Sequence, residues 1–424
     1  MYGALLLAVL DLGTLFAKSD AWKDQSEMFV VSHKKDGFVF ASDERNIVNC
    51  LNANACTWYD LKVYESRVFF DKNAAEEHIT RVEISLFNKG DAGGALSSEQ
   101  LDEIVSKVTD KLLAPGEKAA APEKISLKTG GTQFKRYFEK GEPKAELAWG
   151  MSKSKFVEYI RLTLFPKDAK IQKNKGSKRA EGAAGKKKIK ENVTKNPNGD
   201  VYIDNVPMVD QGAKGYCAAA VSERVLRYFG TLIDEHEIAQ QAGTSAKGGT
   251  SLSDMRMVVK NVGEKNSLGF MPMVTTFSGG IDELEEDLQR YNRAARKAKK
   301  PTISLDSYRR GMGIDINGLR AAMDPKVIYE AKKMDPRFKK FLAGVRNQID
   351  QGIPIFWGVT LGLFPERGVN PQTSGGHMRL IIGYNDKKKE ILYSDTWGEG
   401  HELKRMPQEW AFAITDDTFF LKPR

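Results

Sequence analysis

Cysteine and histidine are scarce in this sequence, with three and five residues among 424. The odd number of cysteines leaves at least one thiol outside any disulfide. His33 lies beside lysines and His78 follows two glutamates, and neither has a second His, Cys or acid at metal-ligand spacing. His236 and His401 lie in stretches that resemble surface, without an evident partner. The sequence therefore predicts surface histidines, no metal and no cofactor.

Long apolar runs are also missing, and no internal stretch is long enough to span a membrane. The apolar start of the chain continues to Ala17 and is typical of a signal peptide, although no Lys or Arg precedes it and Asp11 interrupts it. We interpret residues 1–20 as a signal peptide, whose removal leaves no transmembrane segment and gives an extracytoplasmic protein, either secreted or periplasmic. An apolar N-terminal helix is the alternative. In an exported protein Cys50 and Cys56 are close enough in sequence for a disulfide, and two reduced core cysteines fit equally well.

Residues 206–230 combine a glycine-rich turn with a helical pattern that begins at Cys217. Apolar residues then recur at helical spacing up to Gly230, where the helix is expected to end. A thiol in the first turn of a helix lies near unpaired backbone N–H groups and the positive end of the helix dipole, which lower its pKa. Six residues upstream is Gln211, whose amide can form an oxyanion hole together with the Cys217 N–H.

The stretch from Gln211 to Cys217 resembles the entry to the active site of papain-like cysteine peptidases, where a Gln precedes the nucleophile by six residues. The continuation through Gly230, the run 233–244 and Gly249-Thr250-Ser251 are closer to the C39-like branch of that superfamily. The resemblance covers about the last 225 residues of the chain. It implies a Cys–His pair with a third residue that orients the histidine, and peptides or proteins as substrates.

His377 lies 160 residues after Cys217, at the start of a run typical of a strand. In papain-like enzymes the base follows roughly 130–150 residues after the thiol, and an insertion explains the difference. A turn at 385–389 and a second strand up to Asp395 complete a predicted hairpin. Because the midpoint of His377 and Asp395 falls in this turn, we expect their side chains to be neighbours across the hairpin.

Asp395 is then placed to accept a hydrogen bond from the imidazole and to stabilise its charged form. The papain-like family usually has Asn in an Asn-x-Trp-Gly setting, whereas this chain has Asp395-Thr396-Trp397-Gly398. Asp in this role is common in the C39-like branch. The resemblance implies that Trp397 shields the pair from water, and a core tryptophan is the other interpretation. Gly248 and Gly249 are candidates for a substrate subsite or for an ordinary turn.

The sequence thus predicts a cysteine peptidase that forms a thioester acyl-enzyme through Cys217, His377 and Asp395. Three other functions remain open. They are a cell-wall amidase or endopeptidase on a related Cys–His fold, a catalytically silent binding module, and a nucleic-acid-binding protein that uses the basic stretch 167–195.

Residues 21–165 form the predicted N-terminal accessory domain. Val82, Ile84 and Leu86 alternate as in a strand with one buried face, and a helix begins at Ser97 with Gln100 at the capping-box position. These patterns indicate an α+β domain, which we interpret as a binding module for substrate or envelope, with an inhibitory pro-region as the alternative.

Residues 166–200 form a predicted flexible, basic linker. The run 167–195 has eleven Lys or Arg and three acids, a net charge of +8 in a chain whose total is +9. No aromatic residue interrupts it to stack on bases, so the sequence disfavours nucleic acid as a partner. An anionic envelope surface is the partner that this linker suggests.

The remaining residues, 201–424, form the predicted peptidase domain. Helical patterns at 254–262, 281–298, 318–333 and 338–352 precede a strand at 354–359 and the hairpin of His377. This order, helices first and an antiparallel sheet second, is similar to the two-lobed papain arrangement. The extra stretch 263–317 is expected at the rim of the cleft. The predicted fold class is therefore α+β in both domains.

Overall fold

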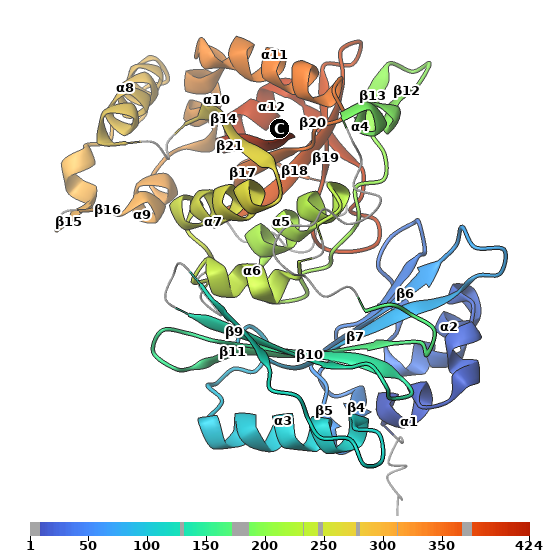
Figure 1. Ribbon diagram of the computed structural model, residues 1–424. Coiled ribbons are helices and arrows are strands. Elements are labelled where there is room, and N and C mark those ends of the chain that lie inside the picture. The colour runs from blue at the N-terminus through green and yellow to red at the C-terminus, as the bar shows by residue number, and fades with distance from the viewer. Residues whose placement is uncertain are drawn as a thin grey trace, which may run out of the picture.

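The computed structural model describes residues 9–127, 131–171, 186–231, 233–244, 249–276, 280–311, 313–366 and 375–424. It is a mixed α and β structure with two large sheets, one built by the N-terminal part of the chain and one by the C-terminal part (Figure 1). This confirms the predicted α+β class. None of the helices in the described ranges is long and apolar enough to cross a membrane.

The N-terminal sheet is antiparallel and has eight strands within the described residues. Their order across the sheet is β2 (Val39–Phe40), β3 (Ile47–Cys50), β6 (Glu65–Asp71), β7 (His78–Asn88), β11 (Val157–Phe165), β10 (Lys144–Met151), β9 (Thr132–Phe138) and β8 (Glu123–Ser126). The alternating side chains of Val82, Ile84 and Leu86 are buried as predicted. Helix α3 (Ser98–Leu112) begins with the expected capping box and covers the outer face of this sheet (Figure 1).

The start of the chain is part of this N-terminal core. Strand β1 (Leu10–Asp11) pairs with β4 (Cys56–Trp58), which also pairs with β5 (Leu61–Lys62). In helix α1 (Leu12–Phe16) both terminal side chains are buried, and α2 (Ser26–His33) follows. Residues 10–16 are therefore part of the N-terminal core, as expected for an apolar N-terminal helix, which was our alternative to a signal peptide. Export remains a prediction. Cys50 and Cys56 are buried free thiols, and the Cys50 thiol donates to the Asp36 carbonyl at 3.4 Å.

The C-terminal sheet is also antiparallel. Its strands are, in order, β12 (Val193–Lys195), β13 (Asp200–Ile203), β18 (Gly375–Asn385), β17 (Ile355–Leu361), β21 (Thr415–Pro423) and β14 (Leu268–Thr275), and β19 (Glu390–Ser394) pairs with both β18 and β20 (Lys404–Pro407). Part of the expected linker is therefore ordered. Helix α4 (Lys186–Glu191) buries Ile189 in the C-terminal core, and β12 joins the sheet, whereas residues 172–185 lie outside the described ranges.

Helices cover both faces of the C-terminal sheet (Figure 1). On the side toward the N-terminal sheet lie α5 (Cys217–Tyr228), α6 (Glu235–Gln241) and α7 (Leu252–Lys265), and on the other lies α11 (Arg337–Ile349). The helical lobe and antiparallel sheet that we predicted are thus present. Because β14 is a strand of the sheet, only the later part of the stretch 263–317 is an addition to it. That part includes α8 (Ile281–Lys297) and the start of α9 (Ile316–Ala321). Together with α10 (Pro325–Lys333) these helices form a separate small hydrophobic core.

Candidate active site

Cys217 is the first residue of helix α5, as the sequence predicted. The preceding turn needs glycine, since Gly212 has φ +65°. Tyr216 is the N-cap residue, so the Cys217 N–H belongs to the first turn and has no acceptor within the helix. The apolar face of α5 is buried against the C-terminal core, which fixes the half-buried thiol in place.

His377 and Asp395 are bonded to each other, with Nε2 of the imidazole 2.6 Å from Oδ1 of the carboxylate. His377 lies on β18 opposite Val359, and Asp395 directly follows β19. The register of the hairpin pairs Leu380 with Ser394, so Asp395 falls opposite residue 379 and diagonal to His377. The two side chains are therefore neighbours, as expected. The strand pairing is displaced by two positions from the one that we predicted, and side chains that lie diagonally on one face of a sheet can still make contact.

Arg379 is a further partner of Asp395 that our sequence interpretation missed. Its Nε donates to Asp395 Oδ2 at 2.7 Å, and its Nη1 lies 3.0 Å from Glu366. Asp395 is fully buried and also accepts from the Thr396 N–H at 2.9 Å. Burial opposes ionisation, but the charges of His377 and Arg379 hold the pKa of Asp395 well below its usual range. The carboxylate is therefore ionised at neutral pH.

The electrostatics of the site favour an ion pair between Cys217 and His377. Burial alone raises the pKa of Cys217, but the charge and hydrogen bond of His377 and the backbone N–H of Met378 lower it overall. Burial likewise lowers the pKa of His377, but Asp395 and Cys217 together raise it to about 9. Because Asp395 occupies Nε2, Nδ1 is the ring nitrogen left for the thiol. A thiolate beside an imidazolium follows from these shifts.

Trp397 lies flat on the His377 ring, with centroids 4.6 Å apart and the planes tilted by 8°. The turn that holds it requires Gly398, which has φ +78°. A side chain at this glycine would place its Cβ 2.5 Å from an Asp210 carboxylate oxygen. The structure thus places Trp397 where shielding of the His377–Asp395 pair would require it.

Gln211 is held by three hydrogen bonds, two of them to Thr396, the residue after Asp395. Its backbone N–H donates to the Thr396 carbonyl at 2.9 Å, and its Oε1 accepts from the Thr396 hydroxyl at 2.6 Å. These contacts point Nε2 toward the nucleophile loop, residues 211–217, where it donates to the Lys214 carbonyl at 3.0 Å. An amide nitrogen carries two hydrogens, so one remains for an oxyanion.

Arg224 ties helix α5 to the segment that carries Asp395, and the sequence gave no signal for it. The guanidinium is almost fully buried and donates to the carbonyls of Pro207 at 2.7 Å and Asp395 at 2.6 Å, and to the Ser394 hydroxyl at 2.6 Å. It lies two helical turns after Cys217. Cys217 and Asp395 are thereby fixed relative to each other.

The two glycines proposed as a subsite are only partly described. Gly248 lies outside the described residues. Gly249 has φ +68°, and a Cβ there would lie 3.4 Å from the carbonyl oxygen of Gly215, two residues before the nucleophile. Gly249 therefore borders the nucleophile loop, and its role as a subsite stays a prediction.

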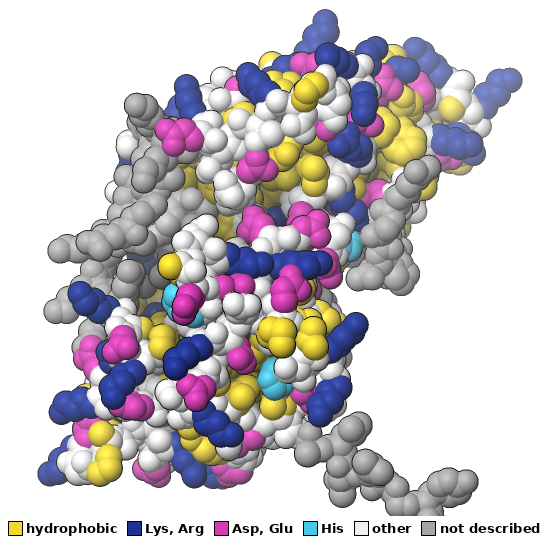
Figure 2. Space-filling model, turned by 90° about the vertical axis from the view of Figure 1, so that its right-hand side faces the viewer, with side chains coloured by type: hydrophobic (Ala, Val, Ile, Leu, Met, Phe, Trp, Pro, Cys, Tyr) yellow, Lys and Arg dark blue, Asp and Glu magenta, His cyan; other side chains and the backbone are white. Residues whose placement is uncertain are grey.

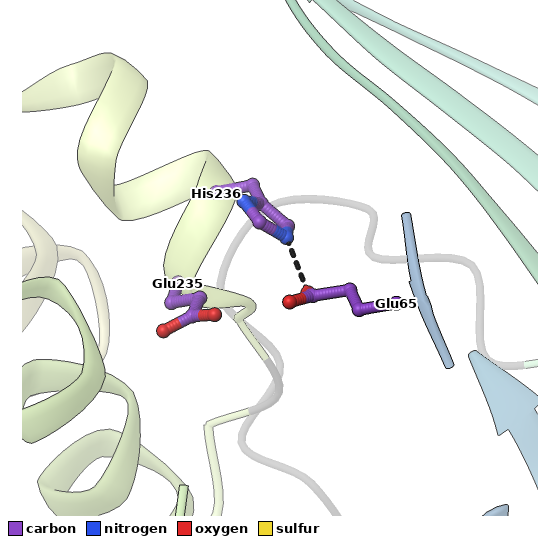
Figure 3. Close-up of side chains that lie close together, drawn as sticks. All are labelled: Glu65, Glu235 and His236. Carbon is purple, nitrogen blue, oxygen red and sulfur yellow. Dashed lines mark hydrogen bonds and ion pairs between the residues drawn. The ribbon is translucent and has the colours of Figure 1, made fainter. Parts of the chain in front are cut away.

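Glu65, Glu235 and His236 approach closely enough to hold a metal ion, and they are the group with this property among the described residues (Figure 3). His236 is buried and lies 2.7 Å from Glu65, so our expectation of a surface histidine without a partner is wrong. The Lys214 ammonium lies 2.6 Å from Glu65 and 3.6 Å from Glu235. Since Lys214 already supplies the positive charge, we interpret the group as part of an ion-pair cluster.

Comparison with known proteins supports the resemblance inferred from the sequence. Residues 281–414 match the model of the Peptidase_C39 like family. The matched range contains His377 and Asp395 and begins after Cys217. The resemblance to C39-like peptidases is thus confirmed for this part of the C-terminal half.

A structural comparison finds xylellain, a cysteine protease from Xylella fastidiosa. The two sequences are 13% identical, the similarity covers 60% of this chain and 94% of that chain, and the TM-score is 0.25. No curated protein matches the sequence.

Proposed function

We propose that this protein is a cysteine peptidase that hydrolyses peptide bonds through Cys217, His377 and Asp395. The observation that carries the proposal is the hydrogen-bonded His377–Asp395 pair beside Cys217, where His377 lowers the pKa of the thiol and Cys217 and Asp395 raise the pKa of the imidazole. The family match over residues 281–414 supports the same class of enzyme. Groups tuned in opposite directions and in mutual contact are typical of nucleophile–base pairs.

In the first half of the reaction, the Cys217 thiolate attacks the carbonyl carbon of the scissile peptide bond. The negative charge that forms on the carbonyl oxygen is stabilised by the Gln211 amide and the Cys217 N–H. When the tetrahedral intermediate collapses, the C–N bond breaks and the imidazolium gives its proton to the leaving amine. The products of this half are a thioester on Cys217 and a neutral His377.

In the second half, His377 takes a proton from water, and the resulting hydroxide attacks the thioester. The C–S bond breaks, the acid product leaves, and the thiolate–imidazolium pair is restored. Asp395 remains ionised throughout, because its role is to orient the ring and to stabilise its charged form. No cofactor is needed for this sequence of steps.

The test is the alkylation rate of Cys217 as a function of pH, measured by mass spectrometry on the peptide that contains it. That readout separates Cys217 from Cys50 and Cys56. In the wild type we expect rapid alkylation well below pH 7, and we call this part of the pH profile the acid limb. It should be lost in His377→Ala. His401→Ala is the matched control, since His401 packs edge-on against Trp397 at 5.6 Å and should keep the acid limb.

Hydrolysis of a peptide library, with Cys217→Ala as the blank, completes the test. We expect cleavage by the wild type and by His401→Ala alone. A Cys217 that titrates near ~8.5, as a free thiol does, or that stays unreactive would overturn the assignment of the nucleophile.

A further inference from the structure

Lys214, three residues before the nucleophile, is anchored by carboxylates from outside its own loop. Its side chain is 1% exposed, and the ammonium lies 2.6 Å from Glu65, 3.3 Å from Asp91 and 3.6 Å from Glu235. Glu65 lies on β6 and Asp91 follows β7, so two of the three belong to the N-terminal part of the chain. Burial lowers the pKa of Lys214, but these carboxylates raise it overall, so the ammonium is charged.

The backbone of Lys214 is bonded to the groups that carry out the proposed chemistry. Its carbonyl oxygen accepts from the Gln211 side-chain amide at 3.0 Å and from the Tyr216 N–H at 2.8 Å. One acceptor therefore sets the direction of the oxyanion donor. A shift of Lys214 would move the Gln211 amide, whereas Cys217 is held by helix α5, which is packed in the C-terminal core.

The surface on which this loop rests is shaped by the N-terminal part of the chain. Gly90 faces the loop, and a Cβ there would lie 3.0 Å from Lys214 Cδ and 3.1 Å from Tyr216 Cζ. The Tyr216 ring is buried and packs edge-on against His236 at 5.7 Å. Figure 3 shows His236 and Glu235, from the start of α6, pointing toward Glu65.

Charges of both signs alternate across this contact between the two parts of the chain. Arg67 on β6 lies 2.8 Å from Glu235 and 3.6 Å from Glu223 on α5. Further along, Arg161 on β11 lies 2.8 Å from Glu237. Figure 2 shows basic and acidic side chains mixed at the level where the two parts meet. A buried charge that loses its partner is costly, so such a contact favours one relative placement of the two parts.

We propose that Lys214 is a positioning residue through which the N-terminal sheet holds the nucleophile loop in its active geometry. This inference rests on the peptidase function proposed above. It assigns the N-terminal part an activating role, in contrast to the binding module or inhibitory pro-region that the sequence suggested. The contact acts on the oxyanion donor Gln211, and it leaves the Cys217–His377 pair intact.

The decisive variant is Lys214→Met in the full chain, compared with Gln211→Ala and with Lys135→Met. Lys135 is a matched control because it is also a buried lysine at the same contact, 3.4 Å from Glu237 and 3.6 Å from Glu146, away from the nucleophile loop. Loss of one oxyanion donor costs roughly 10²–10³ in kcat. We expect a loss of this size for Lys214→Met with a smaller change in KM, and for Lys135→Met a change within a few-fold.

Two further results would separate positioning from general loss of structure. The double variant Gln211→Ala/Lys214→Met should be no slower than the slower single variant, because both changes remove the same donor. The acid limb of Cys217 alkylation should persist in Lys214→Met, since it depends on His377. Equal rate losses in Lys135→Met and Lys214→Met, or an unchanged kcat in the latter, would overturn the proposal.

Amide hydrogen exchange on the peptide that spans 211–217 supplies a readout that needs no turnover. Lys214→Met and Glu65→Gln should speed exchange in this peptide, and Lys135→Met should leave it near the wild-type rate. Glu65→Gln also covers the case in which Lys214→Met does not fold. If exchange speeds up in these variants but Cys217 of the wild type is unreactive, the peptidase function alone is refuted. If the wild type is an active peptidase but exchange in the 211–217 peptide does not change in the variants, the role of Lys214 is refuted.

Discussion

Arg379 is the residue on which the ionised state of Asp395 depends most after His377 itself. The guanidinium bridges Asp395 and Glu366 in the interior, so its removal leaves two buried carboxylates without their shared cation. Loss of one charge-assisted hydrogen bond costs about 1.5–3 kcal/mol. We expect Arg379→Met to lower kcat roughly 10–100-fold, because Asp395 then no longer fixes the imidazole.

Steady-state kinetics on a cleaved peptide and chemical unfolding would measure the two effects of this substitution. Arg379→Lys keeps the charge but not the planar fork, so it should fall between wild type and Arg379→Met. Activity equal to wild type in Arg379→Met would show that His377 alone orients the carboxylate.

Gly398 offers a second test at the residue scale, through the turn that places Trp397 on His377. Both Gly398 (φ +78°) and Gly400 (φ +82°) have left-handed backbones, but only at Gly398 would a Cβ meet a neighbour, the Asp210 carboxylate. We expect Gly400→Ala to lose about 1–3 kcal/mol of unfolding free energy from backbone strain, and Gly398→Ala to lose more. Thermal unfolding and kcat/KM should be measured for both variants. Equal losses of unfolding free energy in the two would contradict the predicted clash at Gly398.

These residues mark the limit of what the sequence could predict. Cys217, Gln211, His377, Asp395 and Trp397 stand in a recognisable order and spacing, so the sequence alone proposed them as site residues. Arg224 was missed because Ser394 and Asp395, two of its partners, lie 170 and 171 positions away along the chain. Arg379 was missed although Asp395 and Glu366 are only 16 and 13 positions away. The one available signal for Arg379 was its place two residues after His377, which puts both side chains on the same face of a strand.

At the scale of secondary structure, helix α5 has to be aligned with the end of β19 for the thiol and carboxylate to act together. Arg224 makes this connection through the carbonyl of Asp395 and the hydroxyl of Ser394. We expect Arg224→Met to reduce the unfolding free energy by about 2–5 kcal/mol and to move the acid limb of Cys217 alkylation to higher pH, because the helix is no longer fixed against the base.

Arg227→Met is the matched control on the same helix. Arg227 is also nearly buried, but it pairs with Glu83 and Glu223 on the side that faces the N-terminal sheet. The Arg227→Met variant should therefore be less stable than the wild type, but the acid limb of its Cys217 alkylation should stay at the same pH. A shift of equal size in both variants would mean that the thiol responds to general loosening of α5.

Pairing between elements was harder to predict than the elements themselves. The hairpin of β18 and β19 was expected from its turn, yet a register irregularity between Ile381 and Gly383 makes its ladder asymmetric. The helical pattern at 318–333 is divided into α9 and α10, and Pro325 stands at the first position of the second helix. Irregularities of this kind depend on tertiary packing, which a periodic pattern does not record.

At the scale of the whole molecule, the two parts of the chain are more closely joined than the sequence indicated. Charged residues that we took for solvated surface, such as Asp234, Glu235 and Glu237, are buried between the two sheets together with His236. Their partners, among them Arg67 and Arg161, lie more than 70 positions away along the chain. Local composition cannot distinguish such a buried network from an exposed polar surface, since both consist of the same residue types.

The proposed ion pair makes a prediction for the pH dependence of global stability. A His whose folded pKa is raised, here to about 9, stabilises the protein fully below its unfolded pKa of ~6.5, and this stability is lost as the pH rises through 9. The lowered pKa of Cys217 acts in the opposite direction. Between pH ~6.5 and ~8.5 the folded pair holds one proton on His377, and the unfolded chain holds one on Cys217. The contribution of the pair should therefore be flat in this window.

In Cys217→Ala that balance is lost, because the folded protein keeps a proton on His377, opposite Asp395, and the unfolded chain has none. The stability of this variant should then fall with rising pH across the same window. The difference in unfolding free energy between wild type and Cys217→Ala should grow by up to ~1.4 kcal/mol per pH unit. Urea unfolding of both proteins at several pH values would measure it, and taking the difference cancels other titrating groups such as His236. A difference that does not change with pH would mean that Asp395, without the Cys217 thiolate, does not hold a proton on His377 in the folded variant.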